Sequence, residues 1–189
     1  EVAARAIDLG VNVINDVSGL SSPAMLELAV AHPQVTFIAM HNLGVPADRA
    51  VTLAPDCDPY EVVRDWILRQ LDGWTRAGLE PHRVIIDPGI GFGKDALQSL
   101  RLLRASGELA RLGVRLLVGH SRKSFMKSLS DHDQAADRDL LTVGASLKLC
   151  DQGVDIIRVH DVPMHARAYR GWSHLVDMPL PPPERSSEA

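Results

Sequence analysis

The sequence predicts an α/β fold in which buried parallel strands alternate with helices, as in barrel enzymes. Five short apolar runs have the length and β-branched content of strands, and most segments between them have helical spacing. Each run ends in a cluster of polar residues and glycines. Because parallel strands place their carboxyl ends on one rim, where barrel enzymes build their sites, we expect the five strand ends to form one pocket.

The expected elements follow from local signals taken in chain order. Gly10 ends a first helix, Ser22 and Pro23 begin the second, and Asp58 with Pro59 begins the third. The expected strands span residues 11–14, 35–40, 83–86, 115–118 and 154–159. The expected helices span residues 1–10, 23–32, 59–77, 96–112, 121–129, 137–151 and 163–174.

Bulk properties favour one soluble cytoplasmic domain. The chain has 189 residues, is 46% hydrophobic and carries a net charge of −4 with both signs scattered, so no basic face suggests nucleic acid or an anionic membrane as a partner. No apolar run approaches the ~20 residues of a membrane span, and the N-terminus lacks a signal-peptide pattern. Cys57 and Cys150 lack metal-ligand spacing, which favours free thiols in a reducing compartment.

Domain organisation is expected to be incomplete. Eight strands are needed to close a barrel, so we expect roughly three further strand–helix units on the N-terminal side, at about 30 residues each. Residues 1–175 form the barrel portion in this interpretation, and the Pro-, Glu- and Ser-rich residues 176–189 form a disordered tail. The irregular stretch 42–58, with three prolines, has the length of a mobile or functional loop.

The strongest local signal is the segment DPGIGFGK, residues 87–94. Its glycines allow close approach of the backbone to a ligand, and Asp87 can accept two parallel hydrogen bonds from the guanidine-like edge of a pterin or purine. A tight turn capped by Asp87 is the structural alternative. The pattern also resembles a nucleotide loop, but it lacks that fingerprint's helix register and acidic partner.

Two further strand ends carry cations. The segment SRKS, residues 121–124, begins an expected helix and suits an anion or an electron-rich ring, with a capping serine and solvated cations as the alternative. Arg158 and His160 share one side of a strand end at a spacing that suits a phosphate-like group. A surface pair of Arg158 with Asp161 is the alternative there.

Two strand ends are ambiguous by themselves. Asn15 either belongs to a turn or offers its amide to a heterocycle. His41 is interpreted as structural or peripheral, because no second histidine or carboxylate stands at metal-ligand spacing. On the third helix, Trp66 and Trp74 are interpreted as packing residues.

Together these motifs resemble the dihydropteroate synthase family over about residues 1–170, in order and near the family's spacing. The matching stretches are VINDVSG (13–19), MH (40–41), IDPGIGFGK (86–94), VGHSRKSF (118–125) and IIRVHDV (156–162). The resemblance implies a (β/α)8 TIM barrel, represented here by about its last five βα units. It also implies condensation of 6-hydroxymethyl-7,8-dihydropterin pyrophosphate with p-aminobenzoate to give 7,8-dihydropteroate and pyrophosphate.

The resemblance also implies residue roles. The implied pterin-binding residues are Asn15, Met40, Asp87, Phe92 and Lys123. Ser121 and Arg122 are implied near p-aminobenzoate, where sulfonamides compete, and Arg158 and His160 at the pyrophosphate. Lys123, Arg158 and His160 are the implied catalytic residues. The family further implies Mg²⁺, with ligands mostly in the missing N-terminal part and none in this segment, and a homodimer.

The sequence also departs from the family. Its N-terminal metal and p-aminobenzoate motifs are absent, so we expect this segment alone to be inactive. After Met40 and His41 the chain continues with NLGVPAD instead of the usual Met-Gln-Gly, which keeps a non-catalytic pterin-binding paralogue as an alternative. A methyltetrahydrofolate-type pterin methyltransferase is a second alternative, although it would not need the motifs at 121–124 and 158–161.

Overall fold

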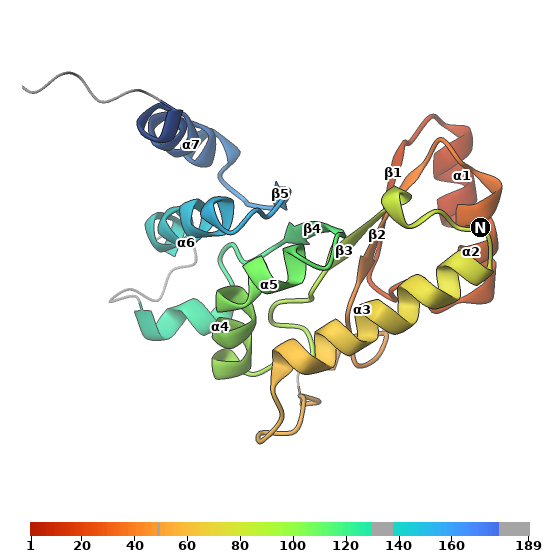
Figure 1. Ribbon diagram of the computed structural model, residues 1–189, viewed down its shortest axis with the longest axis horizontal. Coiled ribbons are helices and arrows are strands. Elements are labelled where there is room, and N and C mark those ends of the chain that lie inside the picture. The colour runs from red at the N-terminus through yellow and green to blue at the C-terminus, as the bar shows by residue number, and fades with distance from the viewer. Residues whose placement is uncertain (49, 130–137, 178–189) are drawn as a thin grey trace, which may run out of the picture.

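The computed structural model describes residues 1–48, 50–129 and 138–177, and it contains one curled parallel sheet (Figure 1). The strands are β1 (Val13–Asp16), β2 (Thr36–Met40), β3 (Val84–Asp87), β4 (Arg115–Val118) and β5 (Ile156–Ile157). They pair in the order β1-β2-β3-β4-β5, with every neighbouring pair parallel. The predicted parallel α/β architecture is confirmed.

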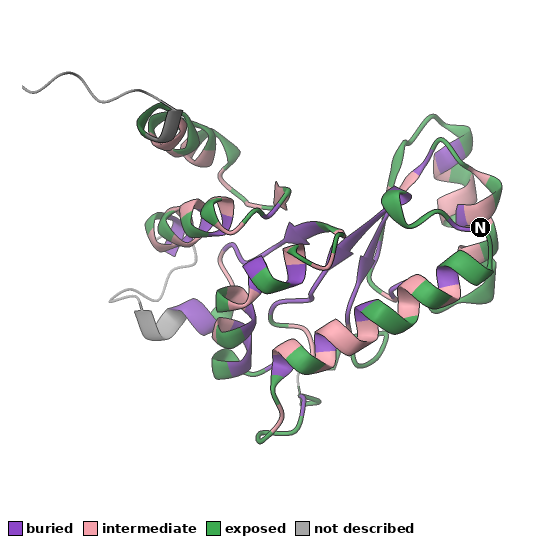
Figure 2. Cartoon of the chain, viewed as in Figure 1, coloured by how far each residue is buried: buried purple, intermediate pink, exposed green. Residues whose placement is uncertain are grey.

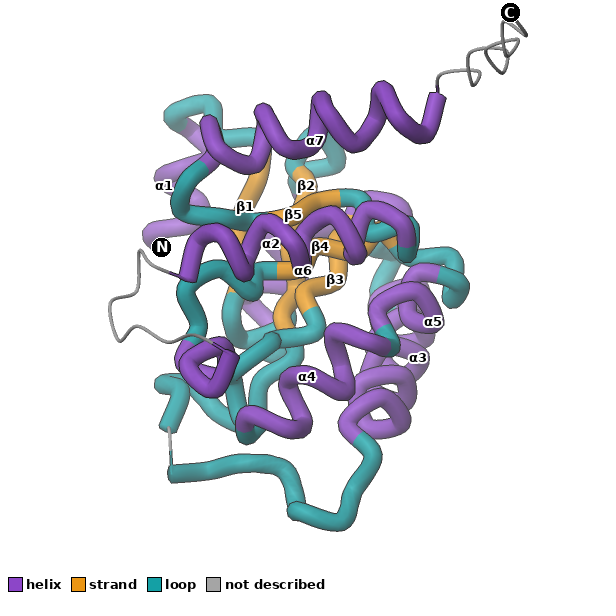
Figure 3. Tube along the Cα trace, turned by 90° about the vertical axis from the view of Figure 1, so that its left-hand side faces the viewer, coloured by secondary structure: helices purple, strands orange, loops and turns teal. Residues whose placement is uncertain are grey.

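Helices follow the strands and surround them in the view of Figure 3. They are α1 (Val2–Asp8), α2 (Pro23–Ala31), α3 (Pro59–Arg76), α4 (Ala96–Arg104), α5 (Ser106–Ala110), α6 (Asp139–Asp151) and α7 (Val162–Asp177), with 3₁₀ turns η1 (Pro81–Arg83) and η2 (Ser124–Leu129). The carboxylate of Asp58 accepts a hydrogen bond from the Tyr60 amide at 2.9 Å and so caps α3 as predicted. Ser22 precedes α2, but its side chain makes no cap hydrogen bond.

The core lies mainly between the sheet and the helices, and buried residues follow the strands in Figure 2. On the helix-facing side, strand residues such as Phe37 and Ile86 pack in one cluster with Ile67 and Trp74 of α3. On the opposite side, a smaller cluster consists of Ile38, Ile85, Leu117 and the half-buried Ile156. This alternation gives the sheet the two apolar faces typical of buried parallel strands.

Several expected elements differ from the sequence-based prediction, beginning with the first strand, which spans Val13–Asp16 instead of residues 11–14. The helix expected over 96–112 is two helices, and the Ser106 hydroxyl donates to the Leu102 carbonyl at 3.2 Å beside the break at Ala105. The last strand spans only Ile156–Ile157, and beside it the Asp155 carboxylate accepts from the Leu116 amide at 2.8 Å. The helix expected to begin at Ser121 is a 3₁₀ turn that begins at Ser124.

The other regional expectations have mixed outcomes. Helix α7 continues to Asp177, two residues past the expected domain end, and the rest of the predicted tail lies outside the described residues. Within 42–58 the structure describes no helix or strand, but the Leu53 amide donates to the Gly93 carbonyl at 3.0 Å, which ties this loop to the glycine-rich segment after β3.

Both cysteines are free. Across the described ranges, every helix is too short or too polar to cross a bilayer.

Candidate active site

Three predicted site residues meet at the carboxyl ends of the strands. Asp87 ends β3, Asn15 lies in β1, and Arg158 follows β5 directly. The Arg158 Nη2 donates to Asp87 Oδ2 at 3.1 Å, and its Nη1 donates to Asn15 Oδ1 at 3.3 Å. We call Asn15, Asp87 and Arg158 the strand-end cluster; it brings together residues that are up to 143 positions apart in sequence.

Asp87 is the buried centre of this cluster. It is only 2% exposed, and its Oδ1 accepts a hydrogen bond from the Gly89 amide at 2.8 Å. Burial raises the pKa of its carboxyl group, while the Gly89 hydrogen bond and the charges of Arg158 and Lys123 oppose that rise. A buried carboxylate with cationic neighbours is a receptor for planar N–H donors.

The glycine loop, residues 88–93, packs too closely on its neighbours for larger side chains. Gly89 has φ +69°, and a Cβ there would lie 2.0 Å from the His41 carbonyl oxygen. The Phe92 amide donates to the Gly89 carbonyl at 2.9 Å, so the segment also forms a tight turn. The two interpretations of this motif therefore describe one structure, in which Asp87 caps the turn through Gly89 and keeps its other oxygen for Arg158.

Lys123 packs on the glycine loop and senses the charges of the strand-end cluster. Its Nζ donates to the Ile90 carbonyl and lies 4.2 Å from the centroid of the Phe92 ring. Burial lowers the pKa of Lys123 to about 8, which the charge of Asp87 opposes and that of Arg158 reinforces. Phe92 and Lys123 thus lie together, with the cation on the face of the ring.

A cavity of about 690 Å³ opens beside Phe92 and Lys123, and we call it the loop cavity. Its lining residues come from the loop after β2, the glycine loop and the segment after β4: Ala47, Asp48, Val51, Thr52, Gly91, Phe92, Gly93, Lys94, Ser121, Arg122, Lys123, Ser124 and Arg138. Ser124, which sequence reasoning did not select, is exposed on this wall. The sequence feature that could have identified Ser124 is its position in the SRKS motif.

Ser121 and Arg122 line the loop cavity but are also engaged elsewhere. The buried Ser121 hydroxyl accepts from the His160 amide at 3.2 Å and lies 2.9 Å from His160 Nδ1. The Arg122 guanidinium donates to both carboxylate oxygens of Asp139, at 2.9 and 2.7 Å, and this holds the pKa of Asp139 below its usual range. His160 is therefore held beside the loop cavity through Ser121.

The remaining predicted residues lie at the rim. Met40 ends β2 opposite Asp87 in register, and it shares the inner face of the strand with Ile38. In the Asn15–Asp16 pair, the Asp16 carboxylate accepts from the amides of Ser18 and Leu20 at 3.0 and 2.8 Å. Asp16 therefore forms the turn, which leaves Asn15 for the strand-end cluster.

Metal-ligating side chains are dispersed among the described residues. Within those ranges, no three side chains of His, Cys, Asp or Glu gather closely enough to hold a metal ion. The strand-end carboxylate of Asp87 is held by Arg158 and the Gly89 amide. An acidic metal cluster would have to come from other residues.

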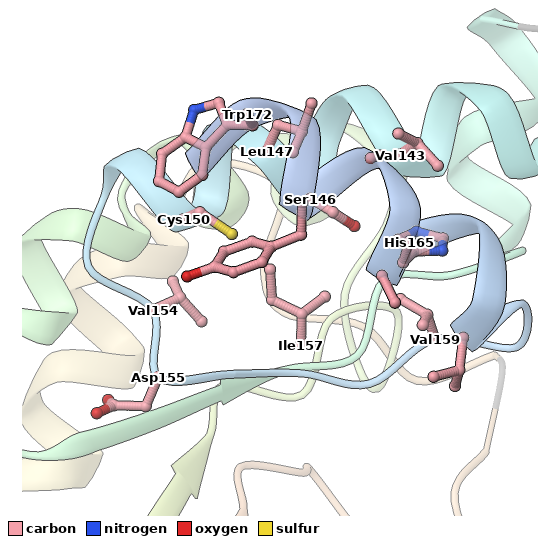
Figure 4. Close-up of a pocket in the computed structure, with 14 residues that line it drawn as sticks. Val143, Ser146, Leu147, Cys150, Val154, Asp155, Ile157, Val159, His165 and Trp172 are labelled. Atoms are coloured by element: carbon pink, nitrogen blue, oxygen red, sulfur yellow. The ribbon is translucent and has the colours of Figure 1, made fainter. Parts of the chain in front are cut away.

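A second cavity, of about 400 Å³, lies between α6, α7 and the β5 segment (Figure 4). Its lining is mostly apolar, with Cys150 and Leu147 from α6, Trp172 from α7, and Val154 and Ile157 below them. It contains none of the predicted site residues. The polar chemistry of the chain is therefore concentrated in the strand-end cluster and the loop cavity.

Comparison with known proteins shows the family to which this chain belongs. Residues 1–160 match the family of pterin binding enzymes, and the chain belongs to that family. It is 39% identical over 163 residues to dihydropteroate synthase from Synechocystis sp., which covers 86% of this chain and 56% of that protein.

Solved structures agree. Xanthomonas albilineans dihydropteroate synthase with 4-aminobenzoic acid matches with a TM-score of 0.86 and 30% identity, over 94% of this chain and 62% of that one. The Anaplasma phagocytophilum synthase with bound 6-hydroxymethylpterin-monophosphate matches with a TM-score of 0.83 and 33% identity, over 92% and 67%. The sheet is thus part of a (β/α)8 barrel, as predicted, and the chain spans about three fifths of these relatives.

Proposed function

We propose that this chain carries the pterin and pyrophosphate sites of a dihydropteroate synthase. The enzyme joins 6-hydroxymethyl-7,8-dihydropterin pyrophosphate to p-aminobenzoate and releases 7,8-dihydropteroate and pyrophosphate. The observation that carries the proposal is the strand-end cluster, in which Asp87 and Asn15 together accept a guanidine group.

Pterin recognition follows from that contact. The amino group and ring N–H of a pterin have the same planar donor pattern as the Arg158 guanidinium. A pterin would therefore replace Arg158 on Asp87 and Asn15. Phe92 and Met40 would pack on the bicyclic ring, and Lys123 would donate to its acceptor atoms from the Phe92 side.

The released Arg158 then has a second task. Its side chain is 44% exposed, so it can turn toward a substrate phosphate without losing a buried environment. The C–O bond to pyrophosphate breaks, its electron pair leaves with the pyrophosphate, and Arg158 and His160 stabilise that charge. The p-aminobenzoate nitrogen forms the new bond to the methylene carbon and loses a proton to solvent.

The loop cavity is the site that we propose for p-aminobenzoate and for competing sulfonamides. It lies beside Phe92 and Lys123, and Ser121, Arg122 and Ser124 supply its polar wall. Mg²⁺ would bind through residues outside the described set and supply further charge for the leaving group. A cytoplasmic homodimer completes the proposal.

The altered loop after His41 supports a second candidate, a pterin-binding paralogue without turnover. The Gly93 backbone lies against Leu43 of this loop, where a Cβ would be 2.6 Å from Leu43 Cγ. The sequence change therefore reaches the pterin-facing glycine loop. The methyltransferase alternative gains no such support. His160 and Ser121 contact each other at the proposed pyrophosphate site, and a methyltransferase would not need that site.

The test is product formation by the complete polypeptide that carries this chain. It is supplied with 6-hydroxymethyl-7,8-dihydropterin pyrophosphate, p-aminobenzoate and Mg²⁺, and dihydropteroate is measured by chromatography. Turnover supports the synthase. Tight pterin binding without product supports the paralogue, and methyl transfer from methyltetrahydrofolate would replace both.

A further inference from the structure

Lys94 follows the glycine loop and lines the loop cavity, but its amino group is held by protein atoms. It is 6% exposed, although lysine is almost never fully buried without a partner. Its Nζ lies 2.9 Å from His41 Nδ1 and 2.9 Å from the Phe92 carbonyl oxygen. Within the described ranges, no carboxylate lies within ion-pair distance of it.

His41 is held as firmly as Lys94. It is 4% exposed, and its ring stands edge-on to Trp66 with the centroids 5.4 Å apart. Its backbone amide donates to the Asp87 carbonyl at 2.9 Å. The imidazole therefore links the end of β2 to α3, and the backbone of the same residue links it to the end of β3.

Burial and the charges around the pair determine which side chain donates the hydrogen bond between them. Burial, followed by the charge of Lys94, lowers the pKa of His41 to about 3, so the ring is neutral at physiological pH and its Nδ1 accepts. Burial also lowers the pKa of Lys94 to about 7, with Asp87 opposing that shift and Lys123 reinforcing it. Arg69 is the other cation that acts on His41.

We propose that Lys94 and His41 are a positioning pair that fixes the glycine loop against the end of β2 and thereby sets the geometry of Asp87 and Phe92 for the pterin. The inference deepens the proposed function and rests on it. The proposal rests on two contacts of the glycine loop. Lys94 fixes the Phe92 carbonyl, and Gly89, which donates to the Asp87 carboxylate, packs directly on the His41 carbonyl.

Three variants test the pair. Lys94→Met keeps the aliphatic volume and removes the donor, and His41→Leu removes the acceptor. His41→Asn is the matched control, because an asparagine oxygen can occupy the position of Nδ1. Measured by calorimetry with 6-hydroxymethylpterin, Lys94→Met and His41→Leu should each weaken binding about tenfold, and His41→Asn should recover most of it. The double variant should be no weaker than either single variant, because both remove the same link.

A readout that does not depend on substrate separates this inference from the proposed function. In Lys94→Met and His41→Leu, hydrogen exchange at the Gly89 and Phe92 amides should rise at least about tenfold, while exchange in α6 stays unchanged. If the wild type binds no pterin, the proposed function fails and the exchange data still decide on the pair. Unchanged loop exchange together with additive or absent binding effects would overturn the pair. If Lys94→Met does not fold, the comparison of His41→Asn with His41→Leu decides.

Discussion

The guanidinium of Arg158 lies directly over the backbone of Gly119 and joins Asp87 to Asn15. An added Cβ at Gly119 would be 2.7 Å from Arg158 Nη2 and 3.0 Å from Nε. Because Gly119 has no side chain, Arg158, which follows β5, can pass the end of β4 and reach Asp87 at the end of β3. This relationship links three motifs that lie far apart in the sequence.

Gly119→Ala is expected to displace Arg158 from Asp87 with little loss of stability, because the crowded atoms belong to a flexible side chain. Because the added methyl group also limits how Arg158 can turn toward the leaving pyrophosphate, we expect kcat/KM for the pterin pyrophosphate to fall about three- to tenfold, measured in steady-state assays of the complete polypeptide. Gly144→Ala in α6 is the control, because its Cβ would meet no atom within 4 Å. Equal activity of the two variants would contradict the role given to the Gly119 space.

Asp87→Asn should separate binding from folding. Asparagine can still accept from the Gly89 amide, and Arg158 is exposed enough to be solvated, so the free energy of unfolding should change by less than about 1.5 kcal/mol. Pterin affinity should fall about 10- to 100-fold, since a charged acceptor for two N–H donors is lost. Urea unfolding and calorimetry measure the two effects; retained affinity would remove Asp87 from the pterin site.

Ser121→Ala tests which substrate this hydroxyl serves. Because Ser121 holds His160 through Oγ, we expect KM for the pterin pyrophosphate to rise about three- to tenfold. Ser124→Ala is the matched variant, and there the KM for p-aminobenzoate should change instead, because Ser124 is exposed in the loop cavity. The reverse pattern would show that Ser121 acts on p-aminobenzoate directly, as part of the wall of the loop cavity, and not through His160.

Acid stability should depend on His41. The pKa of this residue falls from 6.5 to about 3 in the folded state, so the unfolded chain binds more protons between these values. The contribution of His41 to stability is therefore present above pH 6.5 and is lost as the pH falls toward 3. As the pH falls through this window, the unfolding temperature of the wild type should fall more steeply than that of His41→Asn. His120 shifts in the same direction but is common to both proteins. Parallel pH profiles would contradict a neutral, buried His41.

Much of the fold was predictable because each signal was local. The proline and aspartate at the start of α3, the polar strand ends and the spacing of apolar residues define elements without tertiary information. The meeting of Asp87, Asn15 and Arg158 was predictable, because parallel strands place their carboxyl ends on one rim.

The missed features depend on contacts that no local pattern reveals. The bond between Lys94 and His41 joins residues 53 positions apart, and the Ser121 contact to His160 joins residues 39 apart. The Asp155 carboxylate that accepts from the Leu116 amide beside β5 joins residues 39 positions apart. The Arg122 pair with Asp139 likewise crosses 17 positions.

The most direct test compares Arg158→Ala with Arg167→Ala, an exposed arginine of α7, in the condensation reaction. Dihydropteroate and released pyrophosphate are measured together with the complete polypeptide. The account predicts equimolar products from the wild type and Arg167→Ala, and at least about a 100-fold loss in Arg158→Ala. Full activity in Arg158→Ala, or pterin binding without either product in the wild type, would contradict it.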